Sequence, residues 1–297
     1  MKIEFPGLGV TPERLRVVSV HMRIAVAVTI PFLLLLPACV FDDFKDLGES
    51  ITPKTPTQAA TDALDPYNPD LRREGVVLLS NAPFGGADVY LDMYRNYVEH
   101  ETDPLVRAAS ITALGRHGTA EDALLIAPWM SMSVTESQNV RWVAAKALQR
   151  LHNPEVVEPL IDVLVKSTET DGETKAAAAV ALGQYPQDRV FQSLMVALDD
   201  RRLSVNVDAA QSLATLTGQS FGMDRVAWQR WYDGLKDKSS LFADKQDYFY
   251  PTYKRDKLWF EYITFWIQQN YETPSQPTGL RTRSTERRTW DEADESS

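Results

Sequence analysis

The sequence has 297 residues and a formal net charge of −10, because 41 Asp and Glu outnumber 31 Lys and Arg. This acidic balance argues against a nucleic-acid-binding protein, since a phosphate backbone requires a basic surface. It also disfavours attachment to anionic lipid through a polybasic patch. Hydrophobic residues make up 44% of the chain and charged residues 24%, which indicates a folded body of one or two domains. The single cysteine, Cys39, excludes an intrachain disulfide.

Residues 1–38 are predicted to be a signal peptide. Residues 24–36 (IAVAVTIPFLLLL) form a 13-residue apolar stretch directly after Arg23. A membrane-spanning helix needs about 20 residues, so this length fits the hydrophobic region of a signal peptide. Met22 is an alternative start that would give a more compact leader.

Residues 36–39 (LPAC) close this apolar stretch with a small residue and a cysteine. They resemble the bacterial lipobox, and the resemblance implies cleavage after Ala38 and a lipid on Cys39. The protein would then be anchored to a bacterial cell-envelope membrane and face the periplasm. Val40, in place of Asp, favours sorting to the outer membrane in Gram-negative lipoproteins. An uncleaved anchor, or an ordinary signal peptide with an incidental free cysteine, is the alternative.

Residues 39–66 are predicted to be a flexible tether that begins at the lipidated cysteine. Pro53, Pro56 and Pro66 interrupt this segment, and its apolar residues show little periodicity. Such a composition is typical of a spacer between an anchor and a folded body.

The strongest pattern in the chain is a repeat within residues 67–218. Five segments align: LRREGVVLL (71–79), VRAASITAL (106–114), VRWVAAKAL (140–148), TKAAAAVAL (174–182) and VNVDAAQSL (205–213). Their second positions are 31 to 35 residues apart, and a leucine closes each segment. These second positions are Arg72, Arg107, Arg141, Lys175 and Asn206.

A second set of amphipathic segments alternates with the aligned segments. Val157, Leu160 and Leu164, for example, follow the i, i+3, i+7 spacing of one helix face. We therefore expect helix pairs with a period of about 34 residues. The alternating helices are expected over residues 87–100, 121–132, 154–167 and 188–200, and Gly115, Gly183 and Gly218 are predicted to end the aligned helices.

The V-R-x-x-A-A-x-A-L segments, together with the P-L-I-x-x-L helix at residues 159–164, resemble HEAT repeats. The resemblance covers about half of the chain, and the Trp-Leu-Gly-Tyr positions of tetratricopeptide repeats are missing. It implies an all-α fold: a right-handed α-α solenoid of about four to five helix pairs, with one helix of each pair lining a concave face. Such arrays mostly bind other macromolecules.

The four aligned bases have two interpretations. They could form an anion-binding or partner-binding stripe along one face of the solenoid. Alternatively, each base could pair with a carboxylate of an adjacent unit, as in the ladder common in HEAT-type repeats, with Asp103, Asp162 or Asp199 as examples of partners.

Residues 219–272 are predicted to be a helical, aromatic-rich cap. Residues 221–237 indicate one more amphipathic helix that closes the stack. Of the 29 aromatic residues, 15 lie in 221–271, which makes this segment unusual. Its residues 240–271, which include Trp259 and Trp266, would pack back on the solenoid, dock a partner or lie in a membrane interface. Residues 273–297, rich in Ser, Thr, Arg and Glu, are predicted to be disordered.

The sequence contains none of the common catalytic motifs. There is no Gly-rich phosphate loop, HExxH, GxSxG or cysteine pair, and the four histidines are scattered. We therefore expect no cofactor and no metal. The favoured interpretation is a lipid-anchored, non-catalytic scaffold that binds protein on its concave face. The alternatives are a HEAT-like lyase or cofactor-handling enzyme subunit, and a purely structural envelope spacer.

Overall fold

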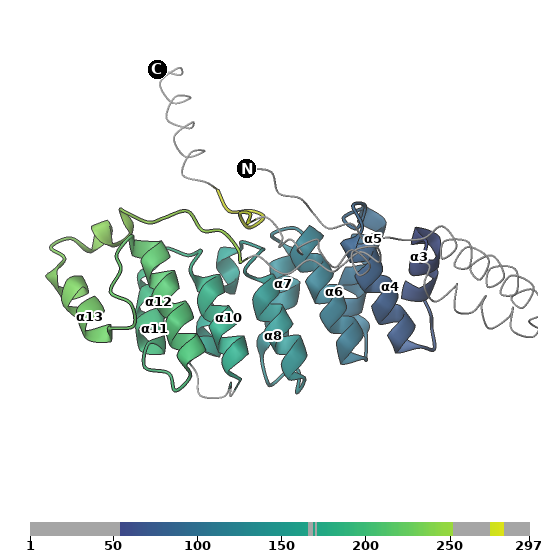
Figure 1. Cartoon of the computed structure of the whole chain (residues 1–297), viewed down its shortest axis with the longest axis horizontal. Coiled ribbons are helices and arrows are strands. Elements are labelled where there is room, and N and C mark those ends of the chain that lie inside the picture. Colours follow the sequence, from purple (N-terminus) through teal and green to yellow (C-terminus); the bar gives the residue numbers. More distant parts are fainter. Residues whose placement is uncertain (1–53, 166–168, 170, 252–273, 282–297) are drawn as a thin grey trace, which may run out of the picture. The chain divides into compact units, whose positions relative to one another are not determined.

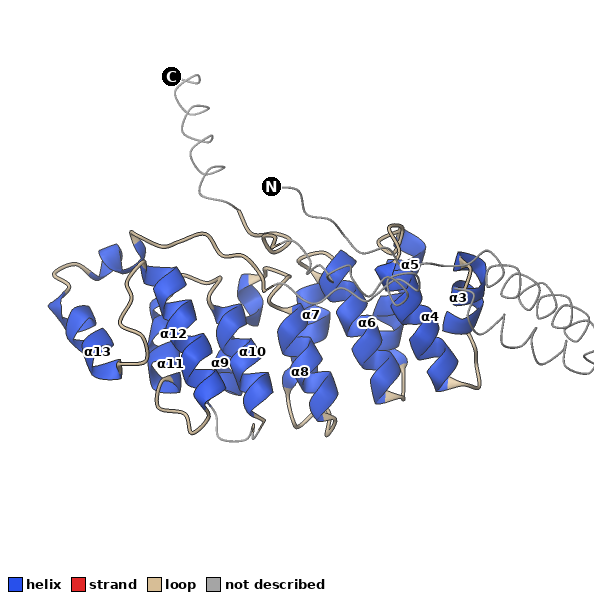
Figure 2. Cartoon of the chain, in the orientation of Figure 1, coloured by secondary structure: helices blue, strands red, loops and turns tan. Residues whose placement is uncertain are grey.

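The structure of the protein is a computed structural model that describes residues 54–165, 169, 171–251 and 274–281. This part of the chain belongs to one compact unit that begins at Lys54. Its regular elements are eleven α-helices and three short 3₁₀-helices, and Figure 2 shows no strand among them. The predicted all-helical fold class is confirmed. The predicted signal peptide, Cys39 and the first part of the tether lie outside the described residues.

The helices stack as pairs in chain order and form two layers (Figure 1). The first layer consists of α3 (Pro56–Ala63), α5 (Asp88–His100), α7 (Asp122–Ile126) with η1 (Ala127–Met130), η2 (Pro154–Val156) with α9 (Val157–Val165), α11 (Asp188–Ala197) and α13 (Arg225–Gly234). The second layer consists of α4 (Pro69–Asn81), α6 (Pro104–His117), α8 (Gln138–Ala147), α10 (Gly172–Leu182) and α12 (Leu203–Thr217). Each second-layer helix contacts the next, so five pairs form the predicted α-solenoid.

Helix α3 lies inside the segment that was predicted to be tether. Thr55 and Gln58 form a reciprocal capping box, and Pro56 occupies the first turn, where its missing N–H costs nothing. Ala59 and Ala63 are buried against α4, where a Cβ on Gly75 would lie 2.3 Å from the backbone nitrogen of Ala63. The boundary at residue 66 was therefore wrong, because a helix with only two small buried residues gives almost no periodic signal.

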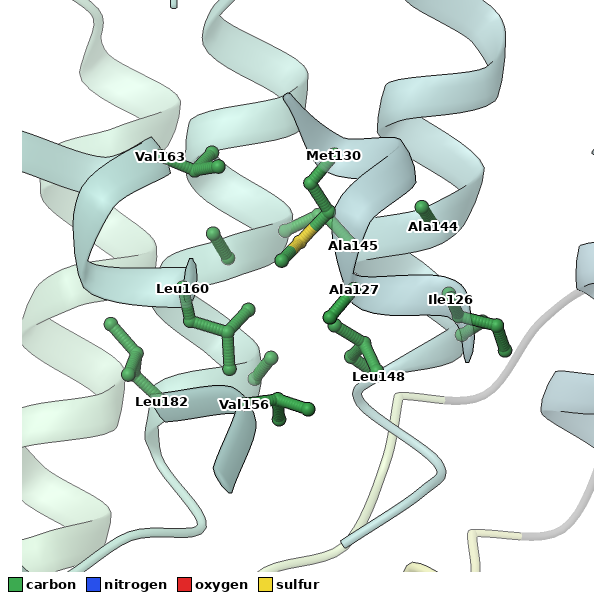
Figure 3. Packing of buried hydrophobic residues seen from close by; sticks show 14 of the residues in the cluster. Ile126, Ala127, Met130, Ala144, Ala145, Leu148, Val156, Leu160, Val163 and Leu182 are labelled. Carbon is green, nitrogen blue, oxygen red and sulfur yellow. The ribbon is translucent and has the colours of Figure 1, made fainter. Parts of the chain in front are cut away.

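The core is continuous along the solenoid and lies between the two layers. Figure 3 shows Ile126 and Met130 of the first layer packed near Ala144, Ala145 and Leu148. All five side chains are essentially inaccessible to solvent. Alanine in the second layer allows helix backbones to approach closely, and larger side chains of the first layer fill the space between the layers.

The three aligned glycines have different roles. Gly218 ends α12 in the left-handed conformation, with φ of 70°, and Gly183 is the C-terminal cap of α10. Gly115, in contrast, lies inside α6, and a Cβ at this position would lie 3.0 Å from the Cβ of Ala147. The prediction that Gly115 ends its helix was wrong, and the residue is instead needed for close packing of α6 against α8.

Helix α13 closes the last pair, as predicted. Asp224 caps it, and Trp228 is fully buried with its ring centroid 6.3 Å from that of Phe191 on α11. The chain then forms η3 (Lys238–Phe242) and turns back along the helix ends. The predicted cap is therefore helical at its beginning, while residues 252–273, with Trp259 and Trp266, lie outside the described part of the chain.

Two segments after η3 form what we call the C-terminal strap, residues 243–251 and 274–281. The backbone N–H of Gln246 donates to Thr215 at the end of α12, at 2.8 Å. Further along, the N–H of Thr278 donates to the carbonyl of Arg150, and the N–H of His152 donates to that of Thr278, both at 2.9 Å. Residues 274–281 are thus paired with the chain after α8, and the prediction of disorder from residue 273 was wrong for them.

Candidate protein-binding surface

Three of the four aligned bases form an internal ladder between successive repeats. Nitrogen–oxygen distances are 2.8 Å for Arg72–Glu101 and Arg141–Glu169, and 3.2 Å for Lys175–Asp200. The side chains of Arg141 and Glu169 are only 5% and 3% exposed, so this pair is enclosed by protein. These contacts fit the ladder interpretation. Because the three bases already donate to carboxylates of the chain, they are poorly placed to bind an external anion.

The carboxylates of the ladder are not those named from the sequence. Asp103 caps α6 by accepting from the backbone of Leu105 and Val106, and Asp199 pairs with Arg225. Asp162 lines a separate cavity of about 230 Å³ on the first layer. The actual partners precede the N-caps of the second-layer helices, where sequence periodicity gives no signal.

Each ladder carboxylate also holds the start of the next helix. Glu101, Glu169 and Asp200 lie two residues before an N-cap residue and accept the backbone N–H of that residue, at 3.0, 2.7 and 3.0 Å. Burial opposes the ionisation of Glu101, but the hydrogen bonds from Arg72 and the backbone outweigh it and lower its pKa. The triplet E-T-D at 101–103 and again at 169–171 is the sequence signal that could have revealed this site.

Arg107 departs from the ladder. The position equivalent to its carboxylate holds Thr135, whose hydroxyl accepts the N–H of the N-cap residue Ser137 at 3.2 Å. The Arg107 guanidinium instead donates to the carbonyls of Val98 and Glu101 and lies 3.9 Å from the centre of the Trp129 ring. Burial lowers its pKa.

A groove of about 350 Å³ lies between α6 and α8 on the exposed side of the second layer. Small residues, Gly115 and Ala147, bring the two helices together at its floor. Trp142 forms one wall, with the Lys146 ammonium 4.2 Å from the centre of its ring. The groove is lined by Thr112, Gly115, Arg116, Trp142, Val143, Lys146, Ala147 and Arg150.

The groove is cationic, and the helices next to it carry acidic groups. Burial, and then the charge of Arg150, lower the pKa of Lys146. On α12, burial and the charge of Glu173 raise the pKa of Asp208 to about 6. The second layer therefore presents basic groups on α6 and α8 and acidic groups on α10 and α12.

The groove was not predicted from the sequence. Trp142, Lys146 and Arg150 lie at positions i, i+4 and i+8, a spacing that places them on one helix face. That spacing could have indicated the groove, but these three residues lie on a different face of the helix from the aligned base Arg141.

Among the described residues, no cluster of His, Cys, Asp and Glu is placed to hold a metal, and no helix has the length and apolar character needed to cross a membrane.

Comparison with known proteins supports the repeat assignment. Residues 126–214 match a family model described as HEAT repeats. The HEAT-repeat resemblance is confirmed for this segment. No curated protein matches the chain.

The solved structures that are similar to the chain include YibA and a phycocyanin lyase complex. YibA from Escherichia coli is 19% identical with a TM-score of 0.45, and the match covers 61% of this chain and 64% of YibA, less than two thirds of its length. The complex of CpcE and CpcF of phycocyanin lyase from Nostoc sp. is 16% identical with a TM-score of 0.29, and the match covers 62% of this chain and 92% of that chain.

Proposed function

We propose that this protein is a non-catalytic scaffold of the bacterial cell envelope that is held at a membrane by a lipid on Cys39. Its second helix layer binds another protein. Stacked helix pairs support this role because they expose an extended surface and rarely carry chemistry.

The groove between α6 and α8 is the observation that carries the proposal. It combines a partly buried Trp142 with the cationic groups of Lys146 and the more deeply buried Arg150, and Trp and Arg are enriched among the residues that dominate binding energy. The surrounding chain is acidic, with a net charge of −10, so a basic groove on it selects an acidic or aromatic segment of a partner.

The scaffold role is tested by purifying the full chain from gently solubilised envelope and identifying co-purifying proteins by mass spectrometry. We expect a stoichiometric partner with the wild type and with Tyr67→Ala, which removes a 92% exposed aromatic ring outside the groove. Trp142→Ala should lose most of this partner while melting as a folded protein. Equal recovery with all three proteins contradicts binding in the groove, and no partner with any of them contradicts the scaffold.

The anchor is tested separately by Cys39→Ser. Without the thiol no lipid can be attached, so we expect the protein to leave the outer-membrane fraction and to accumulate as a precursor of higher mass. Cell fractionation and immunoblotting measure both changes, and Trp142→Ala is the control because it keeps Cys39. A mature-size band in an unchanged membrane fraction would overturn the lipid anchor.

A further inference from the structure

The groove between α6 and α8 has an apolar body and a basic end. Trp142 and Val143 line it on the first half of α8, and Gly115 and Ala147 form its floor. The bases that line it belong to the last turn of α6 or to the end of α8, and they are Arg116, Lys146 and Arg150. A ligand that fits the groove therefore combines an apolar body with an anionic group at one end.

Two of these bases are held in place by aromatic rings. The Lys146 ammonium lies 4.2 Å from the centre of the Trp142 ring, and the Arg150 guanidinium lies 4.4 Å from the centre of the Tyr250 ring. A neutral ring orients a cation without neutralising its charge. These two contacts thus fix the positions of the bases and leave the end of the groove positive.

Lys146 and Arg150 are close enough to act on each other. Burial lowers the pKa of Lys146, and the charge of Arg150 lowers it further. Glu173 on α10 acts in the opposite direction, but more weakly than Arg150. A carboxylate placed between the two bases would relieve their repulsion, because an opposite charge favours the protonated form of lysine.

The C-terminal strap closes the basic end of the groove. The carbonyl of Arg150 accepts the backbone N–H of Thr278 at 2.9 Å. Gly279 has φ of +89°, and a Cβ there would lie 2.9 Å from the carbonyl oxygen of His152. Only glycine combines this conformation with so close an approach, so the strap has a fixed position here. A polypeptide in the groove could not continue past Arg150 without displacing the strap.

The length of the groove limits how much of a polypeptide it can hold. From Trp142 to Arg150 it follows α8 for about 12 Å, at ~1.5 Å per residue. An extended chain advances ~3.3 Å per residue, so about four residues fill the groove. The groove is thus suited to the last few residues of a chain.

We propose that the groove binds the free C-terminal end of a partner protein, with apolar side chains beside Trp142 and the terminal carboxylate between Lys146 and Arg150. This inference rests on the proposed function and names the part of the partner that is bound. Because the strap forms an end wall, the site distinguishes a chain end from an internal segment of the same sequence.

The proposal is tested with the purified full-length chain on a peptide array. Each peptide has a random sequence in its last four residues and is made both as the free acid and as the C-terminal amide. We expect peptides with apolar or aromatic last residues to bind roughly tenfold more tightly as acids, because the terminal carboxylate forms charge-assisted hydrogen bonds. Fluorescence anisotropy of the best pairs measures this ratio.

Two variants connect the preference to the groove. Lys146→Gln removes the charge and should weaken binding of the best free acids about tenfold, while the amides change little. Lys236→Gln removes the same charge at an exposed position outside the groove and should bind like the wild type. Melting temperatures equal to that of the wild type show that both variants are folded.

Three results would overturn C-terminal recognition. The first is an array without any preference for free acids, and the second is an equal effect of Lys146→Gln and Lys236→Gln. The third is tight binding of amides that contain Asp or Glu, which would mean that side-chain carboxylates of an internal segment are bound. A partner that still co-purifies with the wild type and is lost with Trp142→Ala would in each case leave the proposed function intact.

Discussion

At the scale of single residues, the second layer holds ionisable side chains whose surroundings disfavour the charged form. Asp208 is the clearest example, because burial and the nearby charge of Glu173 raise its pKa to about 6. Lys146 is the opposite case, since burial and Arg150 lower its pKa. Such groups weaken the folded state at the pH where they are charged.

The effect of Asp208 on stability depends on pH. Its pKa is higher in the folded chain than in the unfolded chain, so its contribution is favourable at low pH and is lost as pH rises from about 4 to about 6. Asp208→Asn should therefore raise the melting temperature at pH 7.5 by about 2–4 °C, a value reduced for solvent screening of a half-exposed group. At pH 4 the variant and the wild type should melt together. Thermal unfolding at both pH values checks this, and an equal gain at both would show that the charge is not responsible.

At the scale of elements, successive repeats are joined by ion pairs. In each pair, a base on one second-layer helix contacts a carboxylate that also accepts a backbone N–H at the start of the next second-layer helix. This dual role explains why the carboxylate precedes the N-cap: one oxygen accepts the backbone N–H, and the base donates to the other oxygen or, when it is arginine, to both. Arg141 and Glu169 show both contacts. Between α6 and α8 the carboxylate is replaced by Thr135, and Arg107 turns to backbone carbonyls and Trp129.

A carboxylate at position 135 should complete the ladder. We expect Thr135→Glu to raise the melting temperature by about 2–4 °C, because a partly buried pair with Arg107 is worth roughly 1 kcal/mol. Thr135→Gln has the same size without the charge and should give a smaller gain. Differential scanning calorimetry measures both. A gain that persists in an Arg107→Met background would show that no such pair forms.

At the scale of the whole molecule, one core runs through all five helix pairs, so a defect in the middle affects the repeats on both sides. Ala145 of α8 lies at 0% exposure within this core. The strap adds a second connection, because it joins the ends of α12 and α8 across the intervening repeat.

A charge at Ala145 should disrupt the array. Ala145→Glu places an unpaired carboxylate between packed helices at a cost of several kcal/mol, about 3–5. We expect the melting temperature to fall by ~10 °C or more, or the cooperative transition to disappear, as measured by circular dichroism. Asn139→Glu, at an exposed position of the same helix, should melt like the wild type. A normal melting curve for Ala145→Glu would mean that α8 packs with a different face inward.

The sequence by itself determined the repeat, the pairing of helices and the closing helix α13. These depend on apolar residues three and four positions apart, which act within one helix and are legible in the sequence. Tertiary structure alone decided several contacts between repeats: the partners of the aligned bases, the packing role of Gly115 and the groove beside Trp142. It also decided how α3 packs on α4 and how residues 274–281 return to the end of α8. Each of these joins segments at least ten residues apart, and their meeting depends on how the helix layers stack rather than on any local preference.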